Sequence, residues 1–276
     1  MSRLKKIPFS RMQTLSDSGV FIKHFDRYGK TMMRSYSHRD DYYIIVLLTA
    51  GAAAVEIDFG RKEMKNGDIL ILSPGQVHSK PAGEVWHADG WMLAFLPEIL
   101  SEAETRAIEE YAIAPRPFNP GANAVEDIVS LLAMLERNID NHSISQSLAA
   151  AVKSYVLSTL GASDTDVSGR YMAITVRLRK LLDTHLATEK RPAVYASMLN
   201  ISEVYLNEAV KGATGLSAGA YIRGRVVVQA MRQLAYTSMS AKEIAYSLGY
   251  DDYSYFSKLF KKRVGKSPTD YRKNLK

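Results

Sequence analysis

The sequence of 276 residues contains no cysteine. Disulfide bonds, thiolate zinc sites, iron–sulfur clusters and thiol-based redox sensing are therefore excluded, and a reducing compartment suits the chain. Long hydrophobic runs are missing as well, because the longest apolar stretch, Tyr42 to Val55, has 14 residues, whereas a membrane-spanning helix needs about 20. The first residues, MSRLKKIPFSRMQTL, carry charge but no apolar segment with a small-residue cleavage site, so they do not form a secretory signal. We expect a cytoplasmic protein with no membrane partner.

Two phosphate-binding loops of enzymes are also absent. The chain has neither GxGxxG nor GxxxxGKS/T, and no Ser-His-Asp spacing typical of nucleophilic catalysis is found. We therefore expect no catalytic residues and no enzyme activity.

The charge is divided unevenly along the chain. The net charge of +7 combines 19 Lys and Arg against 8 Asp and Glu in residues 170–276 with 17 against 21 in residues 1–169. A concentrated positive field attracts a polyanion, and nucleic acid is the usual one because each neutralised phosphate releases condensed counterions. Charge alone also fits a membrane surface or an acidic partner. The length, at roughly 150 residues per domain, indicates two domains.

The N-terminal part has the pattern of a β domain followed by helices. Short strand-like runs such as YYIIVLL, AAVEIDF, DILILS and WMLAFL lie between Ser18 and Phe95 and are separated by turn signals, which predicts an antiparallel sandwich or barrel. After Pro97 the apolar residues recur with helical spacing. We expect an α+β protein: a domain at 1–160, a small polar linker at 161–169 (GASDTDVSG), and a helical domain at 170–276.

One predicted helix carries an apolar stripe, made up of Val125, Ile128, Val129, Leu132, Leu135 and Ile139. Such a stripe can cover the barrel in its own chain, or it can pair with its copy in a second subunit. We expect the homodimer, because twofold symmetry gives DNA-binding proteins two half-sites.

The stretch from Gly67 to His78, GDILILSPGQVH, resembles the second motif of the cupin superfamily, whose small barrel often binds metal through histidines and a glutamate. Metal-binding members have a His-x-His pair and a later Glu, where this chain offers His38-Arg39-Asp40 followed by Asp41-Tyr42-Tyr43. A metal site built from His38, Asp40 and His78 is one alternative, since two imidazoles and a carboxylate form a known facial set.

We instead expect no metal and no cofactor, and a barrel interior that binds a small-molecule effector. The candidate pocket residues are Tyr42, Tyr43, His78, Trp86, His87 and Trp91.

The C-terminal part contains an internal duplication. AxxLNI from Ala196 to Ile201 recurs as AxxLGY from Ala245 to Tyr250, and LNEAVKGATGLSAGAYI at 206–222 recurs as FSKLFKKRVGKSPTDYR at 256–272. Each copy reads as a short helix, a tight turn and a second helix, with Asn200 or Gly249 supplying the left-handed residue that the turn requires.

The residues that follow each copy predict helix ends and starts. Gly215 and Gly265 fit C-caps, and Ser217 and Ser267 fit the N-caps of the next helices. Residues 218–236 then form a long helix that joins the two copies.

This part resembles the AraC/XylS family of bacterial transcription regulators. The residues that carry the resemblance are Arg225, Ala230, Leu234, Ile244-Ala245, Leu248-Gly249-Tyr250, Asp252, Tyr255-Phe256, Phe260-Lys261, Gly265, Ser267-Pro268 and Tyr271-Arg272. The resemblance implies a cupin-like effector and dimerisation domain, a DNA-binding domain of two helix-turn-helix units, double-stranded DNA and RNA polymerase as partners, and an activator role. It also implies that the two units enter successive major-groove segments about 34 Å apart.

The resemblance assigns roles to the second helix of each unit. The base-reading candidates are Val204, Tyr205, Asn207 and Glu208 in the first unit, and Tyr253, Ser254, Ser257 and Lys258 in the second. Asn can pair with adenine through two hydrogen bonds, Glu can accept from cytosine, and Lys can reach guanine. The phosphate-contact candidates are Lys211, Lys261, Lys262 and Arg263. The alternative from another class is a metal-dependent cupin enzyme with an appended DNA-binding module.

Overall fold

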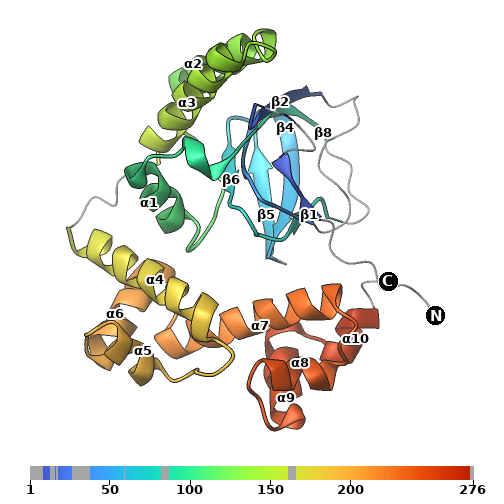
Figure 1. The fold of residues 1–276 in the computed structure, drawn as a ribbon, viewed down its shortest axis with the longest axis vertical. Coiled ribbons are helices and arrows are strands. Elements are labelled where there is room, and N and C mark those ends of the chain that lie inside the picture. The colour runs from blue at the N-terminus through green and yellow to red at the C-terminus, as the bar shows by residue number, and fades with distance from the viewer. Residues whose placement is uncertain are drawn as a thin grey trace. The chain divides into compact units, whose positions relative to one another are not determined.

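The computed structural model describes residues 9–12, 16, 18–26, 38–58, 60–81, 87–160 and 166–273. The chain forms two compact units, Pro8–Gly161 and Ala162–Lys276, which we call the sheet unit and the helical unit (Figure 1). Of the predicted linker at 161–169, residues 161–165 lie outside the described residues, and a helix begins at Asp166.

The sheet unit is built on short strands. They are β1 Phe9–Ser10, β2 Val20–Phe25, β3 Arg39–Asp40, β4 Tyr43–Ile57, β5 Gly60–Lys65, β6 Ile69–Leu72, β7 His78–Ser79 and β8 His87–Phe95. Six of them form an antiparallel sheet in the order β2-β8-β4-β5, with β6 and β7 also paired to β4, while β1 and β3 form a separate parallel pair. The 15-residue strand β4 is the centre of the sheet, because β6 pairs with its first half and β5 with its second.

Both faces of this sheet are buried. Side chains alternate along a strand, so Ile45 and Leu47 belong to one hydrophobic core while Ile44 and Val46 belong to another. The first core is completed by three helices, α1 Glu102–Tyr111, α2 Ala122–Arg137 and α3 His142–Ser158, which follow the short 3-10 helix η2 Pro97–Ile99. The second core contains residues of β2, β4, β5, β6 and β8. The mixed helix and sheet architecture agrees with the α+β prediction.

The apolar stripe on α2 packs inside its own chain. Ile128, Leu132 and Leu135 are buried in the first core, and Val125, Val129 and Ile139 are partly buried against it. The structure therefore uses these residues to cover the sheet, which is the first of the two alternatives for the stripe.

The helical unit contains α4 Asp166–His185, α5 Pro192–Met198, α6 Glu203–Thr214, α7 Ala218–Tyr236, α8 Ala241–Ser247, α9 Tyr253–Val264 and α10 Pro268–Lys273. The pairs α5/α6 and α8/α9 are the two predicted helix-turn-helix units, and α7 contacts helices of both pairs. The predicted bounds of α7 are confirmed. Within the described part of the chain, no helix is both long and apolar enough to cross a membrane.

The turn and cap predictions in this unit are also confirmed. Asn200 has a φ of 57° and Gly249 a φ of 74°, so both adopt the left-handed conformation expected of the turns. Gly215 and Gly265 are left-handed C-caps of α6 and α9. Ser217 caps α7 by accepting a hydrogen bond from a backbone N–H of that helix, which stabilises it by about 1 kcal/mol.

Candidate nucleic-acid interface

The second helix of the first unit, α6, buries one face and exposes the other. Leu206 and Val210 are fully buried, whereas Glu208 is exposed and 70% of the surface of Val204 is accessible. The Tyr205 ring is half-buried and contacts the ring of Tyr171 at a centroid distance of 6.0 Å. Of the predicted base-reading residues in α6, Val204 and Glu208 are therefore the two that project fully into solvent.

Asn207 has a partner inside the helical unit. Its Oδ1 accepts a hydrogen bond of 3.0 Å from the backbone N–H of Ala218, the first residue of α7. Pairing with adenine through two hydrogen bonds uses both the carbonyl oxygen and the amide nitrogen of an asparagine. The predicted pairing with adenine would thus require Asn207 to give up its hydrogen bond with Ala218. In this structure that bond connects α6 to α7.

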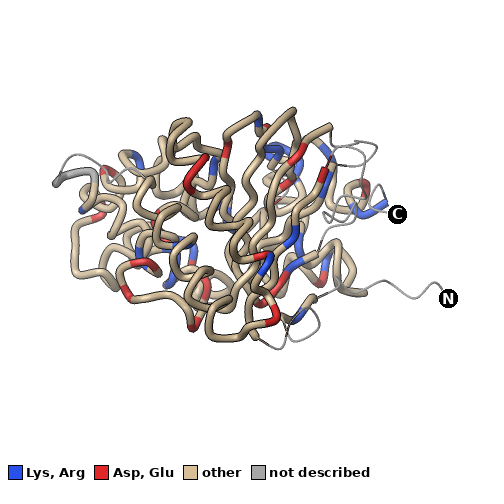
Figure 2. The backbone as a smooth tube through the Cα atoms, turned by 90° about the horizontal axis from the view of Figure 1, so that it is seen from above, with Lys and Arg blue, Asp and Glu red and all other residues tan. Residues whose placement is uncertain are grey.

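The second helix of the second unit, α9, is strongly basic on its outer face. Asp252 caps the helix by accepting a hydrogen bond of 2.7 Å from the backbone N–H of Ser254, and Phe256 and Phe260 anchor it in the core. The exposed residues of α9 are Ser254, Tyr255, Lys258, Lys261, Lys262 and Arg263. Three of the four predicted phosphate contacts therefore lie exposed in the last turn of one helix, and Figure 2 marks such basic positions in blue along the backbone.

A groove of about 560 Å³ lies between α7 and α9. Its lining includes the cationic side chains of Arg223, Lys258, Lys262 and Arg263 together with the ring of Tyr255, and no acidic side chain is among the described residues that line it. Cations gathered in a groove raise the local concentration of an anionic ligand. This arrangement suits a phosphate backbone that passes beside α9.

The turn of the second unit is attached to the loop that follows α4. The Lys190 ammonium donates to the carbonyls of Ala187 at 3.3 Å and Gly249 at 3.4 Å, and it lies 4.9 Å from the centre of the Tyr250 ring. Burial lowers the pKa of Lys190 and raises the pKa of Tyr250 to about 12. The two helix-turn-helix units are therefore joined here as well as through α7.

The six residues predicted to line an effector pocket are spread over the sheet unit. Tyr42 lies in the second core, whereas Tyr43 and Trp91 lie in the first core on the opposite face of the sheet. His87 is exposed, and Trp86 lies outside the described residues. Neighbouring strand residues point to opposite faces, so this set does not form a single pocket.

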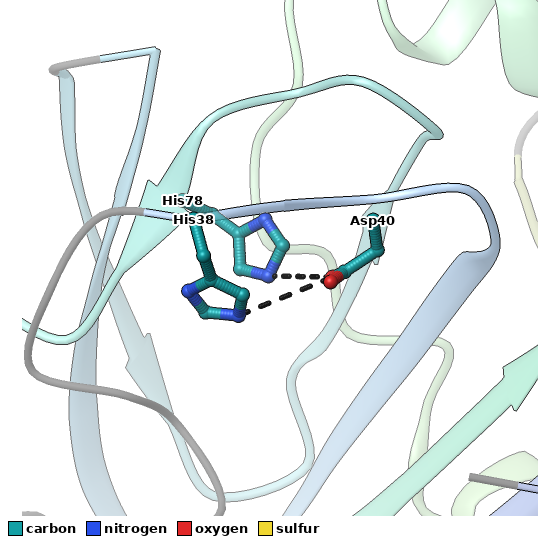
Figure 3. Close-up of side chains that lie close together, drawn as sticks. All are labelled: His38, Asp40 and His78. Carbon is teal, nitrogen blue, oxygen red and sulfur yellow. Dashed lines mark ion pairs between the residues drawn. The ribbon is translucent and has the colours of Figure 1, made fainter. Parts of the chain in front are cut away.

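His78 belongs instead to a buried cluster with His38 and Asp40 (Figure 3). The Asp40 Oδ2 atom is 3.2 Å from Nε2 of His78 and 4.0 Å from Nε2 of His38, and the two imidazole centroids are 4.2 Å apart. Burial raises the pKa of Asp40, but His78, His38 and a hydrogen bond from Tyr42 together lower it by more, so that the net pKa lies below its usual value. Asp40 is therefore a carboxylate at neutral pH.

Comparison with known families matches most of the chain in two parts. An AraC-like ligand-binding domain matches residues 25–157, and a helix-turn-helix domain matches residues 195–274. The chain belongs to the AraC family of transcriptional regulators. The resemblance stated from the sequence is thereby confirmed, and the two matched domains correspond to the sheet unit and the helical unit.

Named relatives of this AraC-family chain include regulators from several bacteria. The Msm operon regulatory protein of Streptococcus mutans is 24% identical over 94% of this chain and 95% of its own length. The transcriptional activator RhaS of Yersinia pestis is 37% identical over 25% of this chain and 26% of its own length. The crystal structure of ToxT from Vibrio cholerae covers 93% of this chain and 97% of its own, at 14% identity and a TM-score of 0.43.

Two residues of the groove in this AraC-family chain were missed by sequence reasoning. Arg223 lies on α7, far from α9 in sequence, and only the packing of α7 against α9 brings it beside Lys262. Tyr255 was assigned to the family pattern without a contact role, yet 57% of its surface is accessible. The available sequence signal was that Tyr255 lies outside the apolar positions of the predicted helix, which include Phe256 and Phe260.

Proposed function

We propose that this AraC-family chain binds specific double-stranded DNA as a homodimer and activates transcription by recruiting RNA polymerase in response to a small-molecule effector. The single observation that carries the DNA-binding part is the exposure of polar and cationic side chains on the second helix of both helix-turn-helix units. The activator role rests on resemblance, since the relative RhaS is named a transcriptional activator. Action on chromosomal DNA places the protein in the cytoplasm.

The base-reading set of the proposal consists of Val204, Glu208, Ser254 and Lys258, which are exposed, with Tyr205, Asn207, Tyr253 and Ser257 half-buried beside them. Phosphate contacts come from Lys211, Lys261, Lys262 and Arg263, to which we add Arg223 because it shares the groove with Lys262. Phosphate contacts fix the register of a protein on DNA, whereas contacts with base edges discriminate between sequences.

The test is binding of the full chain to a library of genomic fragments at several salt concentrations. We expect one or a few preferred fragments, and a linear fall of the logarithm of the association constant with the logarithm of the salt concentration. Equal affinity for all fragments would contradict sequence-specific recognition. Sedimentation of the free protein and of its DNA complex measures the proposed dimer separately.

The effector part of the proposal rests on the match of residues 25–157 to an AraC-like ligand-binding domain. A ligand changes DNA occupancy only if its affinity differs between two states of the protein. A screen of small metabolites for a shift in operator affinity therefore tests it. The alternative of a metal-dependent enzyme needs turnover of a substrate, whereas the Msm protein is named as a regulatory protein and RhaS as a transcriptional activator.

A further inference from the structure

The cluster of His38, Asp40 and His78 is held in place by the backbone. The N–H of His38 donates to the carbonyl of His78 at 3.0 Å, and the N–H of His78 donates to the carbonyl of His38 at 2.9 Å. Asp40 follows His38 by two residues in extended chain, so both side chains leave the same face of the strand. The three side chains therefore meet through strand pairing, and all three are almost completely buried.

The hydrogen bonding of His78 determines which of its ring nitrogens faces Asp40. Nδ1 lies 3.2 Å from the carbonyl oxygen of Gln76, and since a carbonyl can only accept, Nδ1 carries a proton. The other nitrogen, Nε2, then directs its lone pair at the Asp40 carboxylate 3.2 Å away. Two electron-rich atoms in this position require a cation between them, either a proton or a metal ion. Histidine ligands of metals commonly donate their second ring nitrogen to a backbone carbonyl in this way.

Asp40 has little other compensation for its burial. Neither of its carboxylate oxygens makes a hydrogen bond of good geometry among the described residues, although the side chains of His78 and Tyr42 favour its charged form, and both oxygens are shielded from solvent. A buried carboxylate with so few hydrogen bonds is costly unless a cation accompanies it. The nearest cationic candidates in the cluster are the two imidazoles.

We propose that Nε2 of His38, a carboxylate oxygen of Asp40 and Nε2 of His78 bind one divalent transition-metal ion. The ligand atoms lie within 4.8 Å of one another, and donors at about 2.1 Å from a common ion are roughly 3 to 3.5 Å apart, so a small turn of the His38 ring completes the set. Two imidazoles and one carboxylate favour iron, nickel, cobalt or zinc over magnesium and calcium, which prefer oxygen ligands. Three protein donors leave further coordination positions to water or to an oxygen of a bound anion.

The experiment uses the full chain, freed of metal with a chelator and then dialysed against Zn²⁺, Ni²⁺ or Co²⁺. We expect one ion per chain by elemental analysis, and visible absorption bands of Co²⁺ bound to nitrogen and oxygen donors. Asp40→Asn, His38→Gln and His78→Gln are each expected to weaken binding by 10-fold or more. His87→Gln, which changes an exposed histidine on β8, is the matched control and is expected to bind normally.

A measurement on the unaltered chain decides the question if the variants do not fold. The chain contains six histidines, and we expect Zn²⁺ to shift the imidazole resonances of His38 and His78 but not those of the other four. Failure of the unaltered chain to retain an ion, or undiminished binding by folded Asp40→Asn and His78→Gln, would overturn the proposal. The outcome is separate from that of DNA recognition, which the metal-free protein reports through its operator affinity.

Discussion

The second helices of the two helix-turn-helix units, α6 and α9, have similar backbone structures but differ in charge. Both begin at a capped N-terminus and end at a left-handed glycine, and the buried Leu206 and Val210 of α6 correspond to Phe256 and Phe260 of α9. The outer face of α6 carries two acids and one lysine, whereas that of α9 carries four basic residues and no acid. Duplication thus preserved the buried positions while the solvent-facing positions diverged.

This difference divides the work of DNA binding between the two units. Each phosphate that a cation neutralises adds to affinity and salt dependence without regard to sequence, so α9 is expected to supply most of the general affinity. With its two acids, α6 is repelled by phosphates and has to gain its share from contacts with base edges. We expect base substitutions opposite α6 to discriminate more strongly than equal substitutions opposite α9.

The largest expected effect is that of Gly249→Val, which disrupts the turn of the second unit. Gly249 has a φ of 74°, and a Cβ atom there would lie 1.9 Å from the carbonyl oxygen of Ala187. We expect a loss of at least about 3 kcal/mol of unfolding free energy, measured by urea denaturation, together with loss of operator binding. The control is Gly265→Ala, where φ is 81° but nothing lies within 4 Å, and the cost is about 1 to 2 kcal/mol. Equal stability of the two variants would contradict the close approach.

The second prediction replaces Lys261, Lys262 and Arg263 of α9 by alanine together. We expect affinity for all DNA sequences to fall alike, and the salt-dependence slope to flatten by about 2 to 3, because each phosphate contact contributes about 0.9. Fluorescence anisotropy titrations between low and moderate salt measure this slope. Lys211→Ala on α6 is the counterpart, with an expected change of at most about 1. A larger change in the salt-dependence slope from Lys211→Ala than from the triple variant would contradict the proposal that α9 makes most of the phosphate contacts.

The third prediction concerns Asn207 and its equivalent in the second unit, Ser257. Asn207→Ala leaves the buried N–H of Ala218 without its acceptor, which costs about 1 to 3 kcal/mol of unfolding free energy, whereas Ser257→Ala is expected to be nearly neutral. Urea denaturation of both variants makes the comparison. If Asn207→Ala keeps full stability and loses preference at one base pair, its side chain reads DNA as the sequence analysis predicted.

The smallest expected effect is that of Glu208→Gln on α6. Removal of one exposed acid that faces a phosphate-rich surface is expected to raise affinity a few-fold at low salt, because a repulsion of less than about 1 kcal/mol is lost. It is also expected to alter preference at one base pair, since a glutamine favours adenine where a glutamate favours cytosine. A panel of mutated operators measures both changes. An unchanged base preference would show that Glu208 does not reach the bases.

Local signals explain why the helical unit was predicted so closely. Serine caps, left-handed glycines and the residue at each turn act within a few positions of the chain, so the bounds of α7 and the turns at Asn200 and Gly249 follow from the sequence. The bond from Asn207 to Ala218 could not be predicted in the same way. It depends on how α6 packs against α7 in three dimensions.

The sheet unit was harder to predict because both faces of its sheet are buried. Alternation separates Tyr42 from Tyr43, yet it does not tell which face helices cover when both are apolar. An apolar helical stripe likewise does not show which surface it packs against, and the α2 stripe packs against the sheet of its own chain. The contact of His38 with His78 requires the pairing of segments 40 residues apart, and the sequence offered their cluster with Asp40 only as an alternative.

The attachment of Gly249 to the loop around Ala187 and Lys190 bears on which operators this regulator can use. If α7 were the only connection, it could bend or twist so that the two helix-turn-helix units reach DNA segments at a different spacing. The second contact, between the Gly249 turn and the loop at Ala187 and Lys190, restricts this movement. Insertion of one helical turn into α7 would break this second contact as well as increase the distance between the two units. We therefore expect the protein to tolerate changes of base more readily than changes in the distance between its two contact segments.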